Sequence, residues 1–77
     1  MSRVEKRSVS IRGHRTSYSL EQPFHAELAA IAAARALPLA ALIAEIDRNR
    51  ARETNLSSAL RLHVLDWVKR RGSADPL

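Results

Sequence analysis

The sequence has no cysteine, only two glycines, three aromatic residues and no long apolar run. Without cysteine there is no disulfide, no thiol nucleophile and no cysteine-based zinc site. The three histidines are too scattered along the chain to suggest another metal site. No apolar stretch approaches the roughly 18 residues of a membrane span, and the polar, basic N-terminus lacks the apolar segment of a signal peptide. We therefore expect a cytoplasmic protein without a metal or another cofactor.

The size of the chain limits the core that it can form. A chain of 77 residues makes one domain at most, and domains this small bury only about 60% of the surface that the unfolded chain exposes. Yet 45% of the residues are hydrophobic, which is more apolar surface than so short a chain easily hides. This excess predicts self-association, most simply as a homodimer.

Positive charge is concentrated near the N-terminus. The whole chain has 13 Lys and Arg against 8 Asp and Glu, and residues 1–20 contain five of these cations but only one acid, Glu5. A cluster of cations favours a polyanion as the partner, and dimerisation would double the local charge. Double-stranded DNA of the nucleoid would be such a polyanion.

Two short alternating runs predict strands around Gly13. Residues 15–20 alternate with apolar side chains at even positions, whereas residues 7–12 alternate with apolar side chains at odd positions. One unbroken strand cannot bury both sets on one side, so the phase changes at Gly13, where a turn or bulge is easiest. Residues 15–20 are the expected ribbon strand, and residues 7–12 leave the ribbon or fold back across it. Residues 1–6 are expected to form a flexible basic arm.

Helical periodicity predicts three helices after the strands, at about 22–36, 38–52 and 55–71. Pro38 begins the second helix, Thr54 or Asn55 caps the third, and Gly72 ends it, leaving 72–77 as a disordered tail. The fold class is therefore mainly α with one short N-terminal strand. The apolar residues expected in a dimer core are Tyr18, Leu20, Phe24, Leu28, Ile31, Leu42, Ile43, Ile46, Leu60, Val64 and Trp67.

This order of elements resembles the ribbon-helix-helix family of DNA-binding proteins, the group that includes MetJ, Arc and CopG. The pieces KRSVSIRGHRTS at residues 6–17 and NLSSALR at residues 55–61 look like its compact, alphaproteobacterial three-helix branch. The resemblance implies a ribbon-helix-helix homodimer with an intermolecular antiparallel two-stranded ribbon, which enters the major groove, and an additional C-terminal helix. The turn at 35–39 departs from the family because it lacks the usual glycine. A phosphate contact from the second helix then depends on backbone amides, and Pro38 has none.

The resemblance also implies which side chains meet DNA. In a symmetric ribbon centred on Ser17, Arg15 lies opposite the partner's Ser19, so Arg15, Ser17 and Ser19 are the expected base-reading residues. A solvated ribbon face, or a shifted register that uses Ser8, Ser10 and Arg12, are the alternatives. The residues expected to contact phosphates are Arg3, Lys6, Arg7, Arg12 and His14. For His14 a simple turn position is the other interpretation.

These expectations favour a sequence-preferring transcriptional regulator, such as a repressor. The alternatives are an antitoxin, a nucleoid-associated architectural protein and a DNA binder that responds to a guanine dinucleotide second messenger. Dimers could also pair into tetramers on DNA. The sequence contains no nucleophile elbow, phosphate-binding glycine loop or metal-ligand cluster, so we do not expect an enzyme.

Overall fold

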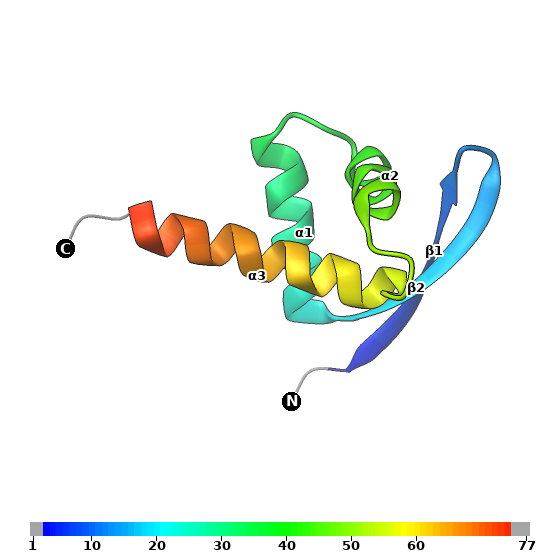
Figure 1. The fold of residues 1–77 in the computed structure, drawn as a ribbon, viewed down its shortest axis with the longest axis horizontal. Coiled ribbons are helices and arrows are strands. Elements are labelled where there is room, and N and C mark those ends of the chain that lie inside the picture. The colour runs from blue at the N-terminus through cyan, green and yellow to red at the C-terminus, as the bar shows by residue number, and fades with distance from the viewer. Residues whose placement is uncertain (1–2, 75–77) are drawn as a thin grey trace.

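The computed structural model describes residues 3–74. The chain forms a hairpin of β1 (Val4–Ile11) and β2 (His14–Glu21), followed by α1 (Gln22–Ala34), α2 (Leu39–Asn49) and α3 (Leu56–Ala74). Figure 1 shows the turn of the hairpin at one end of the molecule and α3 running away toward the other end, with α1 and α2 packed on the same side of α3.

A two-residue turn joins β1 to β2. Both of its residues have left-handed backbone angles, with φ of 49° at Arg12 and 83° at Gly13. Turns of this kind match the twist of paired strands, and they favour glycine because φ is positive. A Cβ atom at Gly13 would meet no atom within 4 Å, so the backbone angle, and not lack of space, selects glycine here.

This turn explains the change of phase between the two alternating runs. The register places Arg7 opposite Tyr18 and Val9 opposite Thr16, so odd residues of β1 share a face with even residues of β2. Their common inner face contributes the buried side chains of Ile11, Tyr18 and Leu20 to the core. Each run therefore buries its own apolar set without a bulge.

The hairpin corrects two expectations. The single short strand that we expected at the N-terminus is accompanied by a second strand, because residues 7–12 fold back and pair with β2 within the same chain. Residues 4–6, expected in a flexible arm, form the beginning of β1, where Val4 pairs with Glu21. Residues 1 and 2 of that arm lie outside the described residues.

The helix ends also differ from those expected. Helix α1 stops at Ala34 because Ala36 is left-handed, with φ of 56°, and Leu37 N–H closes the end on Ala32 O at 2.9 Å. Helix α2 stops at Asn49, after which the backbone of its C-terminal cap is extended. Helix α3 does not end before Gly72 but continues to Ala74, which corrects the expected tail, and residues 75–77 lie outside the described range. A glycine near a helix end therefore did not mark the stop.

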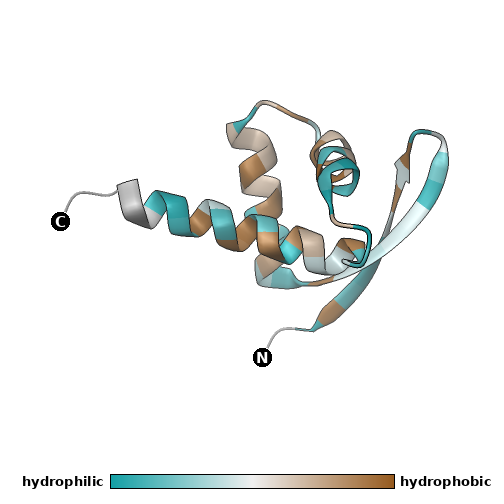
Figure 2. Cartoon of the chain, in the orientation of Figure 1, coloured by the Kyte–Doolittle hydropathy of each residue, from teal (hydrophilic) through white to brown (hydrophobic). Residues whose placement is uncertain are grey.

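The core is formed within one chain by the hairpin and all three helices. Of the apolar residues assigned to a dimer core, Phe24 and Trp67 are half-buried and pack against the core, and the others are buried in it. Helix α3 supplies Leu56, Ala59, Leu60 and Val64. The hydropathy colouring in Figure 2 shows apolar residues along all three helices.

Among residues 3–74, no single helix is long and apolar enough to cross a membrane. Helices α1 and α2 reach the required length only together, and the chain bends by 101° between them. Their apolar residues Leu28, Ile31, Leu42 and Ile43 lie in the core.

Candidate nucleic-acid interface

The outer side of the hairpin is polar, basic and largely exposed. The pairs that face away from the core join Lys6 to Ser19, Ser8 to Ser17 and Ser10 to Arg15. We call these residues the ribbon face. All are exposed except Ser19, which is half-buried. Serine hydroxyls both donate and accept hydrogen bonds, and arginine donates in a planar fork, so this face can bond to polar edges of a ligand.

The base of the ribbon face is fixed by α3. Ser19 N–H donates to Ser57 Oγ at 2.8 Å, and Ser19 O accepts from Arg61 Nη2 at 3.2 Å. Arg61 is itself oriented by Glu21, whose Oε1 accepts from Arg61 Nε at 2.9 Å. This hydrogen bond from Arg61 lowers the pKa of the Glu21 carboxyl. The strand edge is therefore held to the helix through both backbone groups of Ser19.

Arg7 does not belong to the ribbon face. It lies opposite Tyr18 on the inner side, where Arg7 Nη2 donates to Gln22 Oε1 at 3.3 Å and lies 3.7 Å from Glu5 Oε2. Arg7 is therefore less accessible to a phosphate than the exposed cations of the hairpin. The signal was present in the sequence, because Arg7 shares its odd numbering with the apolar Val9 and Ile11 of the same run.

Arg7 belongs instead to a small polar group at the start of α1. The rings of Tyr18 and His25 stack with centroids 6.3 Å apart, and Tyr18 Oη lies 3.4 Å from His25 Nε2. Burial raises the pKa of the Tyr18 phenol, and the charge of Arg7 partly offsets this shift. Burial lowers the pKa of the His25 imidazole, and the charge of Arg7 lowers it further. These groups join the hairpin to α1 and leave the ribbon face free.

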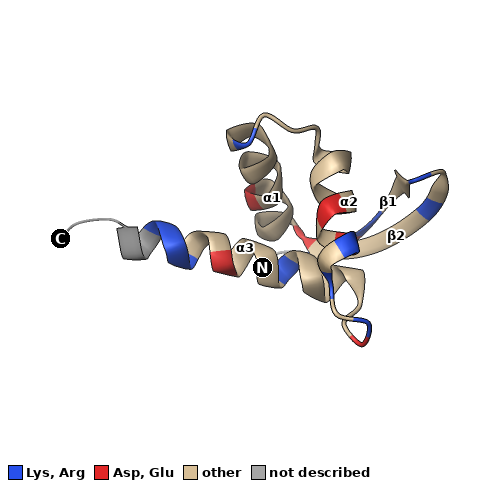
Figure 3. Ribbon diagram, turned by 45° about the horizontal axis from the view of Figure 1, so that its top comes forward, with Lys and Arg blue, Asp and Glu red and all other residues tan. Residues whose placement is uncertain are grey.

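The other expected phosphate contacts are exposed around the hairpin. Arg12 lies in the turn, His14 follows it at the start of β2, and Arg3 precedes β1. Lys6 lies on the ribbon face itself. Figure 3 shows Lys and Arg on the hairpin and again on the last turns of α3, at the two ends of the molecule.

From the sequence, we expected only residues of β2 on the ribbon face. The structure adds Ser8 and Ser10, which we had considered only in a shifted register, and it brings them together with Arg15, Ser17 and Ser19. Ser8 and Ser10 are at even positions, whereas Val9 and Ile11 are at odd positions of the same run. The alternation alone therefore places the two serines on the outer side of the strand. The sequence did not indicate with which strand the run that contains Ser8 and Ser10 pairs.

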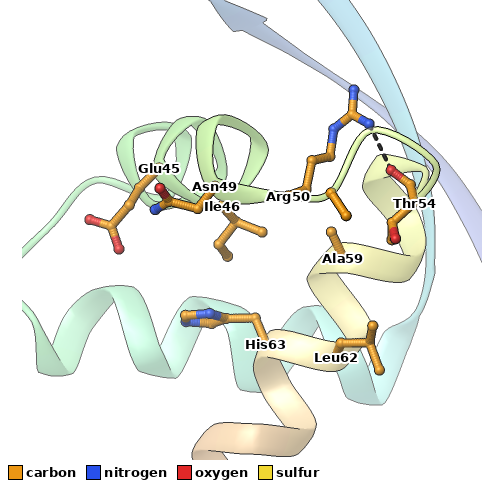
Figure 4. A pocket seen from close by; sticks show the side chains of 9 residues that line it. Glu45, Ile46, Asn49, Arg50, Thr54, Ala59, Leu62 and His63 are labelled. Atoms are coloured by element: carbon orange, nitrogen blue, oxygen red, sulfur yellow. Dashed lines mark hydrogen bonds between the residues drawn. The ribbon is translucent and has the colours of Figure 1, made fainter.

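A separate pocket of about 360 Å³ lies between the end of α2, the following loop and α3. Figure 4 shows His63 and Ile46 on its two sides, with Arg50 Nη1 donating to Thr54 O at 2.7 Å. His63 Nε2 is buried without a hydrogen-bond partner, and burial lowers the pKa of His63. No lining residue belongs to the ribbon face. Among residues 3–74, no group of His, Asp and Glu could hold a metal ion.

A family model described as "Ribbon-helix-helix domain" matches residues 4–68, which is most of the chain. The chain belongs to the ribbon-helix-helix family. No curated protein and no solved structure matches it significantly.

Ribbon-helix-helix domains are DNA-binding regulators and not enzymes, and they usually form dimers. The matched range covers β1, β2, α1, α2 and most of α3. DNA is therefore the class of partner to consider for the ribbon face.

Proposed function

We propose that the ribbon face enters the major groove and that the protein is a sequence-preferring transcriptional regulator. The observation that carries this proposal is the exposed set of Ser8, Ser10, Arg15 and Ser17 on one side of a two-stranded ribbon. The major groove is about 12 Å wide and admits a two-stranded β-ribbon. Repression by occupying a promoter is the simplest regulatory outcome of such binding.

Arg15 is the residue most suited to specify a base. An arginine fork donates two hydrogen bonds to O6 and N7 of guanine, which is the commonest specific contact in the major groove. Ser17 and the neighbouring serines bond to any base pair and adapt to several sequences. Ser19 is half-buried at the base of the ribbon, so we assign it a smaller share of the base contacts. We therefore assign the main discrimination to Arg15.

The surrounding cations position the ribbon without specifying sequence. Arg3, Lys6 and Arg12 are exposed along and beyond the hairpin, and His14 lies beside the turn. Contacts to phosphates supply affinity that falls as salt rises, because bound counterions are released. They fix the depth and orientation of the ribbon in the groove.

The test compares Arg15→Ala with Arg48→Ala, a matched control at an exposed arginine of α2 that does not belong to the ribbon face. Fluorescence anisotropy measures binding to a preferred duplex, selected from genomic fragments, and to a random duplex over a salt series. We expect Arg15→Ala to weaken preferred binding by about 5- to 150-fold, with a much smaller loss on random DNA. Arg48→Ala should change neither.

Two other results would argue against a sequence-preferring regulator. A steep salt dependence without a preferred fragment would favour an architectural, nucleoid-associated role over site-specific regulation. The absence of binding at low salt would contradict the proposal altogether.

A further inference from the structure

The pocket between the end of α2 and α3, which we call the α2–α3 pocket, is large enough to hold a small molecule. Its volume of about 360 Å³ lies within the range of roughly 300–1,000 Å³ that ligand sites usually have. Ile46, Ala59 and Leu62 line it from the two helices, so its walls are mostly apolar (Figure 4). Apolar walls with a few polar groups are the usual composition of a site for a small ligand.

One polar atom of the α2–α3 pocket has no partner. His63 lines the pocket from α3, and its ring lies between α3 and α2 in Figure 4. Its Nε2 atom is buried and makes no hydrogen bond within residues 3–74. An unbonded polar atom in a protein interior costs free energy, and nearly all such atoms have a partner. His63 is therefore the group of this pocket that a ligand would satisfy.

The charged side chains that line the pocket are already paired. Glu45 accepts two hydrogen bonds from Arg35, at 2.6 Å and 3.0 Å. Arg50 Nε donates to Asp47 Oδ1 at 2.7 Å. His63 is neutral at pH 7, because burial lowers its pKa. A charged ligand would leave water without meeting a free opposite charge, which is unfavourable, whereas an uncharged ligand has no such cost.

The other side of His63 offers no free charge either. His63 also lines a second cavity, of about 280 Å³. Arg70 Nη2 lies there at 2.8 Å from Asp66 Oδ2. Arg35, which lines this cavity too, is the partner of Glu45. Within residues 3–74 every charged lining residue of the two cavities is thus paired, and the surroundings of His63 favour an uncharged ligand.

We propose that the α2–α3 pocket binds a small uncharged molecule that has an apolar body and a hydroxyl group, and that the hydroxyl bonds to His63 Nε2. The Nε2 atom of a neutral imidazole donates in one tautomer and accepts in the other, and a hydroxyl can partner both. The apolar body packs against Ile46, Ala59 and Leu62. No residue of the pocket belongs to the ribbon face, so the proposal does not rest on DNA binding.

The first test compares three probes that share one ring. The probe 4-methylphenol carries a hydroxyl, toluene has no polar group, and 4-methylbenzoate carries a charge. Backbone amide chemical shifts of the isotope-labelled full chain measure binding at neutral pH. We expect 4-methylphenol to bind with a dissociation constant of about 1 mM and to shift the amides around Ile46, Ala59 and His63. Toluene should bind about fivefold more weakly, because it cannot bond to His63, and 4-methylbenzoate about tenfold more weakly, because its charge loses water.

His63→Phe tests the polar contact. The substitution keeps an aromatic ring and removes both ring nitrogens. Because His63 Nε2 makes no hydrogen bond within the described residues, the variant should fold, and circular dichroism checks its helix content. We expect His63→Phe to bind 4-methylphenol no more tightly than toluene.

Ala51→Leu tests the position of the site. Ala51 lines the pocket and is exposed, so a leucine there should leave the core intact while it takes up part of the volume of the ligand. The affinity for 4-methylphenol should fall about fivefold or more. Ala41→Leu, at an exposed position of α2 outside the pocket, is the matched control and should bind as the wild type does.

Four results would overturn the proposal. They are equal or tighter binding of toluene or 4-methylbenzoate by the wild type, a preference for the hydroxyl that His63→Phe retains, an unchanged affinity of Ala51→Leu, and the absence of amide shifts around the pocket at a concentration about tenfold above the expected dissociation constant. The measurements contain no DNA, so a failure here is distinct from a failure of the proposed function.

Discussion

Ser10 of β1 lies directly opposite Arg15 of β2, and both side chains are exposed on the ribbon face. The two residues come from separate alternating runs that the Arg12–Gly13 turn folds together. A serine and an arginine of one chain can therefore meet neighbouring bases. In a ribbon built from the β2 strands of two chains, Ser10 would not lie opposite Arg15.

Ser10→Ala tests this pairing. Loss of a hydroxyl that bonds to a base edge should weaken preferred binding by roughly 1 kcal/mol, which is about fivefold, and leave random DNA nearly unaffected. Competition anisotropy with both duplexes measures the difference. Ser58→Ala, a serine of α3, is the control. Equal affinities for the two variants would show that β1 does not contact bases.

Ser57→Ala tests the anchor between the ribbon and α3. The substitution removes the acceptor for Ser19 N–H and leaves a partly buried donor without its partner. We expect the free energy of unfolding in urea to fall by about 1 kcal/mol or somewhat more. The Ser58 hydroxyl makes no hydrogen bond within the described residues, so Ser58→Ala should change stability little. Equal stability of the two variants would mean that the Ser57 contact contributes nothing.

Ala36→Gly tests the strained end of α1. A left-handed alanine costs about 1 kcal/mol or more relative to glycine, and Ala36 has φ of 56°. The variant should raise the free energy of unfolding by about 1 kcal/mol. Ala30→Gly, at an exposed position inside α1, should instead lower it by a similar amount. Opposite signs for two identical substitutions are the expected result, and a loss of stability at both positions would contradict the helix end described here.

Periodicity located most of the fold, but it did not identify the strand that pairs with β2. Alternation states which side of a strand is apolar, and it put Tyr18 inside and Ser17 outside. It carries no information on whether the neighbouring strand belongs to the same chain. In the structure the β1 run pairs with β2 within the chain, through a turn at Arg12 and Gly13.

The third helix posed a similar ambiguity. Its apolar residues form a stripe too wide for one surface. Leu60 and Val64 face the core of the same chain, whereas Leu62 and Leu65 stay exposed. Helix ends were the least predictable feature. An alanine, Ala36, adopts the left-handed cap, and Gly72 lies within α3.

Stability should fall as the pH decreases from 7 to 5. Burial lowers the pKa of His25 and His63 in the folded protein, so the folded state resists protonation while the unfolded state binds protons at the ordinary histidine pKa. Their contribution to stability is thus complete above the unfolded pKa and is lost as the pH falls toward the folded pKa. Hydrogen bonds from Arg61 and Arg35 lower the pKa of Glu21 and Glu45. The stability that these two carboxylates contribute is therefore lost only at a more acidic pH.

Urea unfolding at pH 7, 6 and 5 measures this effect. His63→Leu removes one of the two groups, and its stability should depend less on pH than that of the wild type. His14→Gln, at the exposed position after the turn, is the control and should keep the wild-type dependence. A wild-type stability that is constant from pH 7 to 5 would contradict the half-buried, neutral state of both imidazoles.

The central claim is that the ribbon face reads bases in the major groove, and methylation interference tests it most directly. Dimethyl sulfate places a methyl group on guanine N7 in the major groove and on adenine N3 in the minor groove, and N7 is one of the two atoms that Arg15 is proposed to contact. We expect guanine methylation within the preferred site to block binding and adenine methylation to be tolerated. With Arg15→Ala, at least one of these guanines should lose its effect. Interference by adenine alone, or by neither base, would contradict major-groove reading by this ribbon.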